Sequence, residues 1–132
     1  MAAGVALVEH DGRLLLARRP PTGLLGGLWE PVIVPTAHLD ALDATLLARG
    51  VRERVGLQIS VGPKLGRVVH VFSHRRLTAD VFQARVEGGT LSPNHEAYVE
   101  AQWCASGEEP ALSTLARKLL ALRRALPLWD CA

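Results

Sequence analysis

The chain has few cysteine and aromatic residues and no long hydrophobic run. Its two cysteines, Cys104 and Cys131, form no CxxC pair and lie far apart in the sequence, which favours free thiols over a disulfide or a metal site. No apolar stretch approaches the roughly 20 residues that span a bilayer, and no basic leader segment precedes the first apolar run. We therefore expect a cytoplasmic protein without a membrane partner.

The excess of positive over negative charge is also small. The 132 residues are 48% apolar and 21% charged, which is typical of one folded domain, and we expect a monomer with a single domain over residues 1–132. The net charge of +2 conceals pairs of neighbouring basic residues. Each pair alone is typical of a solvated surface, so local clustering bears more on an anionic partner than the net charge does. The pairs are Arg18-Arg19, Arg75-Arg76, Arg117-Lys118 and Arg123-Arg124.

Hydrophobic spacing predicts an α/β sandwich with a mixed sheet and two main helices. The first helix is expected over roughly residues 38–55, with Thr36 as its N-cap and Gly56 as its end. Leucines at helical spacing between Leu112 and Leu126 predict the second helix, which Ser113 would cap. The expected strands cover residues 4–8 and 13–17, joined by an Asp11-Gly12 turn, and residues 58–61, 68–72, 77–86 and 98–104, with a loop over residues 32–38.

A polar loop between two apolar runs carries the clearest binding signal. The runs are Val68 to Phe72 and Leu77 to Val86, and the segment between them reads Ser73-His74-Arg75-Arg76. Because a hairpin tip is held by strands on both sides and stays open to solvent, Phe72-Ser73-His74 would present a stacking ring, a hydroxyl and an imidazole. The alternative is that Phe72 belongs to the core and the loop is only solvated.

The first predicted helix and its exit can be compared with a catalytic motif. Arg49, Glu53 and Gly56 match the Nudix box, Arg-Glu-apolar-x-Glu-Glu-x-Gly-apolar, whereas Gly50 and Arg54 stand where two metal-binding carboxylates belong. Hydrolysis of a nucleoside diphosphate bond needs several carboxylates on one helix face to hold divalent cations. The resemblance therefore implies a Nudix-like fold with a degenerate box, no catalytic residue and no metal site, in which Glu53 is a surface or capping residue.

Three further blocks extend over nearly the whole chain. The first joins Leu14–Pro20 to Gly23–Pro31, the second is Val69–His74 followed by Leu77-Thr78, and the third is Ser113–Lys118. In order and spacing they resemble the C-terminal, Nudix-like domain of the A/G-specific adenine DNA glycosylases, the MutY family. The chain departs from that pattern in having no phenylalanine between Glu30 and Pro31.

This resemblance implies a domain that reads 8-oxoguanine opposite adenine in duplex DNA, while a separate N-terminal catalytic domain removes the adenine. It assigns Ser73 to a hydrogen bond with N7 of the lesion, Phe72 to insertion or stacking beside the base, and His74 to a phosphate or to the loop itself. Alone, the domain would bind DNA weakly. The other expected DNA contacts are Arg18, Arg19, Arg75, Arg76 and Lys118 with phosphates, and the backbone of Gly23, Leu24 and Leu25.

The same resemblance implies no cofactor in this chain, since the family's iron–sulfur cluster belongs to the N-terminal domain. We expect a domain cut from, or encoded beside, a full bacterial glycosylase associated with the nucleoid. Two alternatives stay open. One is a stand-alone Nudix hydrolase of oxidised nucleoside di- or triphosphates, which would need Mg²⁺, and the other is a protein-interaction module without affinity for nucleic acid.

Overall fold

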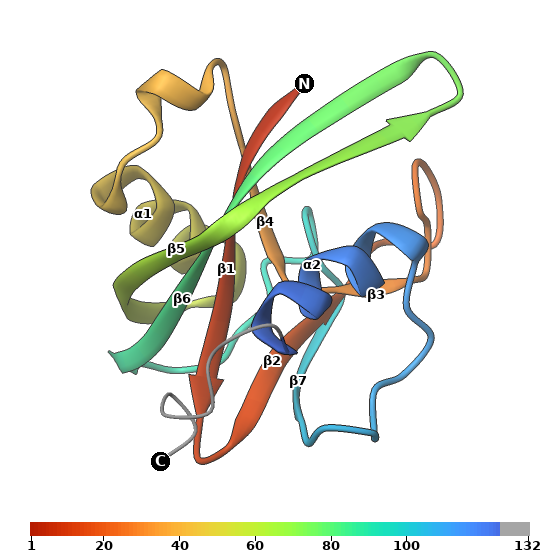
Figure 1. The fold of residues 1–132 in the computed structure, drawn as a ribbon. Coiled ribbons are helices and arrows are strands. Elements are labelled where there is room, and N and C mark those ends of the chain that lie inside the picture. Colours follow the sequence, from red (N-terminus) through yellow and green to blue (C-terminus); the bar gives the residue numbers. More distant parts are fainter. Residues whose placement is uncertain (125–132) are drawn as a thin grey trace.

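The computed structural model describes residues 1–124, which form a sheet packed between two helices (Figure 1). The helices are α1 (Ala44–Val55) and α2 (Thr114–Arg124), and a short 3-10 turn, η1 (Leu39–Ala41), precedes α1. The strands are β1 (Ala2–His10), β2 (Arg13–Arg18), β3 (Trp29–Glu30), β4 (Val32–Thr36), β5 (Leu57–Phe72), β6 (Arg75–Gly89) and β7 (Glu100–Cys104).

The sheet is mixed, and β1 lies at its centre. Strand β1 runs parallel to β6 and antiparallel to β2 and β4, and the continuous order β3-β2-β1-β6-β5 leaves β5 at an edge. Apolar side chains are buried on both faces of the sheet. Leu47 and Val51 of α1 belong to one cluster, and Leu115 and Leu119 of α2 belong to the other. The predicted α/β sandwich with two main helices is confirmed.

The hairpin between β1 and β2 confirms the reading of its turn residues. Asp11 and Gly12 have φ angles of 51° and 76°, and the flanking His10 and Arg13 are paired. Two successive left-handed residues match the right-handed twist of the strands, which is why Asp-Gly favours such turns.

The predicted loop over residues 32–38 is wrong, because Val32–Thr36 forms β4 and pairs with Ala2 to Ala6 of β1. Val32 and Val34 are buried and alternate with more exposed neighbours, so β4 contributes two side chains to the core. The local sequence did not predict this contribution.

The start of the first helix also differs from the prediction. Helix α1 begins at Ala44, and its N-cap is Asp43, whose carboxylate accepts a hydrogen bond of 2.7 Å from the backbone N–H of Leu46. Thr36 instead lies at the end of β4. The predicted end is confirmed, since Gly56 has a φ of 80° and its N–H donates to the carbonyl of Arg52.

A single long strand replaces two predicted ones. Residues 58–61 and 68–72 both belong to β5, which pairs with β6 along its whole length. Shifts of register between Val61 and Lys64 and between Lys64 and Gly66 carry the strand past Gly62-Pro63. The resulting β5–β6 hairpin projects beyond the body of the molecule (Figure 1).

Helix α2 begins as predicted, with the Ser113 hydroxyl accepting a hydrogen bond of 3.0 Å from the N–H of Ala116. The last expected leucine, Leu126, and the second cysteine, Cys131, lie outside the described residues. Cys104 is buried as a free thiol. Over residues 1–124, neither helix has the length and apolar character needed to cross a membrane.

Candidate nucleic-acid interface

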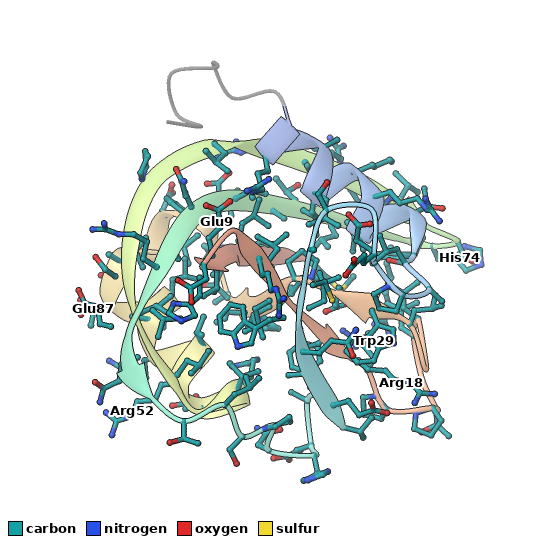
Figure 2. All side chains as sticks on the ribbon, turned by 90° about the horizontal axis from the view of Figure 1, so that it is seen from below. Glu9, Arg18, Trp29, Arg52, His74 and Glu87 are labelled. Carbon is teal, nitrogen blue, oxygen red and sulfur yellow. The ribbon has the colours of Figure 1, made fainter. Side chains whose placement is uncertain are left out.

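The β5–β6 hairpin ends in a two-residue turn formed by Ser73 and His74. Phe72 and Arg75 make the last pair of the ladder, so the turn is held directly by both strands. Both turn residues are exposed, and Figure 2 shows His74 at the outer end of the hairpin. The turn therefore presents a hydroxyl and an imidazole to solvent.

Phe72 is not fully exposed. Its side chain is half-buried and packs against the core cluster on the α2 face of the sheet. The ring meets that of His70 edge to face, with centroids 4.6 Å apart and planes at 71°. The sequence left open whether Phe72 belongs to the core or to an exposed binding loop. The structure has features of both, because the ring packs against the core and directly precedes the exposed turn.

Two other segments lie on the same side of the molecule as the hairpin tip. In Figures 1 and 2 the loop over residues 20–28, here called the glycine-rich loop, and the first turn of α2 both lie toward the tip. Leu25 of the loop, Phe72 and Leu115 of α2 share one apolar cluster. Segments far apart in the sequence are thus brought to one side.

The glycine-rich loop has a fixed shape. Gly23 and Leu25 have positive φ angles of 89° and 55°, and a Cβ on Gly26 would lie 2.6 Å from the carbonyl oxygen of Pro21. The side chain of Leu24 is 46% exposed, whereas that of Leu25 packs against the core. The exposed part of the loop runs from Pro21 to Leu24, and residues 25–28 are more buried.

A buried carboxylate anchors this loop. Glu30 accepts hydrogen bonds from the Tyr98 hydroxyl at 2.7 Å and from the Arg19 guanidinium at 3.3 Å, while Tyr98 in turn accepts from the N–H of Ile33 at 3.0 Å. Burial raises the pKa of Glu30, although Arg19 and Tyr98 act in the opposite direction. Burial, together with the nearby carboxylate, also raises the pKa of Tyr98.

Arg18 and Arg19, which the family resemblance assigns to phosphates, already have partners in the protein. Arg18 donates to the Glu100 carboxylate at 2.8 Å and to the carbonyl of Gly27 at 3.1 Å. Arg19 donates to the carbonyl of Leu24 at 3.0 Å besides its contact with Glu30. Both arginines therefore hold the glycine-rich loop in place.

Arg75 and Arg76 are the more accessible cations. Both are exposed beside the turn, and neither forms an ion pair with a carboxylate of the described residues. Lys118 is exposed on α2, and its Nζ lies 3.1 Å from Nδ1 of His70. The predicted phosphate contacts thus divide into arginines at the tip and cations that contact the protein itself.

Helix α1 carries the positions compared with the Nudix box. A Cβ on Gly50 would lie within 2.7 Å of both methyl carbons of Val34, so β4 occupies the space that a side chain would need. Arg54 donates a hydrogen bond of 3.1 Å to the carbonyl of Gly50. Arg49 and Glu53 are exposed, as expected for surface residues.

The sequence pattern of the NUDIX domain matches residues 3–122. The chain belongs to the NUDIX domain family. It is 31% identical over 129 residues to CTP pyrophosphohydrolase of Escherichia coli (strain K12), covering 92% of this chain and 93% of that protein. It is also 34% identical over 125 residues to adenine DNA glycosylase of Homo sapiens, covering 89% of this chain and 22% of the glycosylase. The chain thus spans less than a quarter of that relative's length.

Solved structures of a MUTYH C-terminal domain and of a NUDIX hydrolase share this NUDIX fold. The C-terminal domain of mouse MUTYH, solved in complex with human PCNA, matches with a TM-score of 0.69 and 25% identity over 93% of this chain and 86% of that one. A MutT NUDIX hydrolase from Burkholderia pseudomallei matches with a TM-score of 0.77 and 21% identity over 95% of this chain and 97% of that one, which shows the fold alone.

An open cleft of about 410 Å³ lies between the glycine-rich loop, β4 and α1 of this NUDIX domain. Helix α1 contributes Arg54 to the lining of this cleft, and the carboxylate among the described lining residues is the exposed Glu96. Within residues 1–124 no group of three or more His, Cys, Asp or Glu side chains is placed to hold a metal ion. The described lining of the cleft holds two arginines, Arg19 and Arg54, beside Glu96, and this donor set does not fit Mg²⁺, which needs several oxygen ligands.

Three residues that shape the site were not predicted from the sequence: Glu30, His70 and Tyr98. The position of Glu30 in the sequence, beside leucines and a tryptophan, could have indicated a buried contact. A carboxylate that is buried among apolar side chains needs a hydrogen-bonding partner. Of the two partners of Glu30, Arg19 is near in the sequence, but Tyr98 lies 68 residues away, and sequence spacing does not reveal that contact. His70 was part of a recognised block, but its contact with Lys118 depends on how α2 packs on β5.

Proposed function

We propose that this NUDIX domain recognises 8-oxoguanine opposite adenine in duplex DNA, as the reading module of an adenine DNA glycosylase. The observation that carries the proposal is the projecting hairpin whose exposed turn, Ser73-His74, follows the half-buried ring of Phe72. The similarity to adenine DNA glycosylase and to the MUTYH C-terminal domain supports it. The excision of adenine and the iron–sulfur cluster would belong to a separate catalytic domain.

The chemistry of Ser73 suits this task. Oxidation converts guanine N7 from an acceptor into an N–H donor and adds an oxygen at C8. A hydroxyl whose own proton is donated elsewhere accepts from N7 of the lesion but has no partner at N7 of guanine, which offers only a lone pair, and such a hydroxyl therefore favours the lesion. His74 in the turn and the exposed Arg75 and Arg76 beside it supply donors that suit phosphate oxygens.

Binding to matched duplexes tests the proposal. We expect the domain to prefer an 8-oxoguanine·adenine duplex over a guanine·adenine duplex at low salt. Ser73→Ala should remove about 1–3 kcal/mol of that discrimination because one lesion-specific hydrogen bond is lost, and Phe72→Ala should also reduce it. The measurement is fluorescence anisotropy with both duplexes at two salt concentrations.

Ser106→Ala is the matched control, since Ser106 is an exposed serine outside the hairpin. It should leave both affinities unchanged. Equal binding of the two duplexes by the unmodified protein, or an unchanged preference in Ser73→Ala, would contradict the assignment of the turn. A protein-interaction module would show no binding to either duplex even at low salt.

A second candidate function is hydrolysis of nucleoside triphosphates. Its support is the similarity to CTP pyrophosphohydrolase over nearly the whole of both chains. Against it stand the closed position of Gly50 and the guanidinium of Arg54 beside the cleft. We expect no release of pyrophosphate or phosphate from CTP or 8-oxo-dGTP in the presence of Mg²⁺. Turnover that Glu53→Gln abolishes would overturn this expectation, because it would show that the remaining carboxylate holds a metal.

A further inference from the structure

We propose that Lys118 and His70 form a positioning pair, which fixes the Phe72 ring and the turn after it against helix α2. This inference deepens the proposed function and rests on it for its consequence in DNA binding. The contact itself is a property of the free protein, so the two can be tested separately.

Strand β5 alternates its side chains across the sheet near the tip. Val69 and Val71 point outward and are 40% and 66% exposed, whereas Val68, His70 and Phe72 lie on the opposite face. Helix α2 packs on that second face. His70 therefore lies between Lys118 of α2 and the ring that precedes the turn.

The hydrogen bond between the pair has a defined direction. An ammonium group has donors only, so the Nζ of Lys118 donates to Nδ1 of His70 across 3.1 Å, and the imidazole proton is carried by Nε2. Burial and the neighbouring ammonium lower the pKa of His70, which keeps its ring neutral and able to accept at neutral pH. Opposite His70 on β6 stands Leu77, an apolar residue.

The imidazole passes this constraint to Phe72. The two rings meet edge to face with centroids 4.6 Å apart, an arrangement favoured by the opposite charges of a ring edge and a ring face. Since Ser73 directly follows Phe72, a ring held by His70 also restrains the backbone position from which the Ser73 side chain projects. Lys118 would thus act on the lesion through His70 rather than through a phosphate.

A double-mutant cycle separates these two roles. His70→Phe keeps an aromatic ring beside Phe72 and removes the acceptor, while Lys118→Met keeps the apolar stem and removes the donor. If they act as a pair, each change should lower the preference for the lesion duplex by roughly twofold to tenfold, the effect of one net hydrogen bond. The double variant should then lose no more than either single variant. Arg117→Met, which removes the neighbouring exposed cation, should leave the preference unchanged.

The free protein provides an independent readout by NMR titration of the His70 imidazole. Lys118→Met should raise the pKa of His70, because it removes an adjacent positive charge, and Arg117→Met should leave it unchanged. An unchanged His70 titration in Lys118→Met, additive losses in the cycle, or a weaker salt dependence of binding in Lys118→Met but not in His70→Phe would overturn the positioning pair. A His70 titration that shifts in a protein with no lesion preference would instead refute the proposed function and leave the contact standing.

Discussion

Gly50→Glu, which restores a carboxylate to helix α1 at its Nudix-box position, is expected to destabilise the fold without creating a hydrolase. The new Cβ would lie within 2.7 Å of both Val34 methyl carbons, and the carboxylate would follow into the same packed space. Overpacking typically costs about 1–3 kcal/mol, and an unpaired charge forced toward the core adds to it, so we expect a loss of about 3 kcal/mol or more. Urea denaturation followed by circular dichroism measures it.

Gly50→Ala provides the sharper comparison. In an exposed helix position the change from glycine to alanine gains about 1 kcal/mol, so any loss of stability here reports the clash with β4. In a Val34→Ala background the two methyl carbons are gone and the nearest atom is the Val34 Cβ at 3.1 Å. The loss should therefore shrink there. A stabilising Gly50→Ala in the unmodified protein would show that β4 and α1 are not packed in this way.

This packing bears on whether a single substitution could create a metal site on α1. Val34 fills the space beside Gly50, so the absence of a side chain at position 50 and the close packing of β4 on α1 depend on each other. Reintroducing a carboxylate at position 50 or 54 alone would then not rebuild a metal site.

Local signals in the sequence predicted the parts of the fold that depend on local chemistry. Asp11-Gly12, Gly56 and Ser113 each specify a turn or a helix end through their own backbone or side-chain preference, and all three lie where expected. The turn between the two apolar runs was likewise evident, although the predicted loop continued to Arg76, whereas the turn is Ser73-His74 and β6 begins at Arg75. These features need no knowledge of distant residues.

The parts that were missed depend on contacts between distant segments. Val32–Thr36, flanked by proline and carrying one itself, reads as a loop, and only pairing with β1 makes it a strand. The bond between Glu30 and Tyr98 and the contact between His70 and Lys118 likewise arise from packing. The candidate site could therefore be located from sequence at its exposed tip, but not in the contacts that hold it.

Glu30→Ala is expected to have the other largest effect, because it removes the shared partner of Arg19 and Tyr98. The Tyr98 hydroxyl would be left buried without its acceptor, and Arg19 would lose its carboxylate. Leaving such groups unpaired costs about 3 kcal/mol here, at the lower end for a broken buried pair, because the Arg19 side chain is one-third exposed. The glycine-rich loop should also lose order, which hydrogen exchange at Gly26 and Gly27 would reveal.

Glu30→Gln separates the charge from the hydrogen bond, and the pH dependence of stability reads out the difference. The pKa of Glu30 is raised above its usual value of 4.5 in the folded protein. At pH values between 4.5 and the raised pKa, the folded state therefore binds more protons than the unfolded state. Stability contributed by this group is therefore fully present below pH 4.5 and declines as the pH rises through the raised pKa. Glutamine imitates the protonated carboxyl and still accepts from Tyr98, so the variant should lack this decline. Subtracting its denaturation curves from those of the unmodified protein cancels the titration of other groups. A difference that does not change with pH would mean that the pKa of Glu30 is the same in the folded and unfolded states, which would contradict the raised pKa.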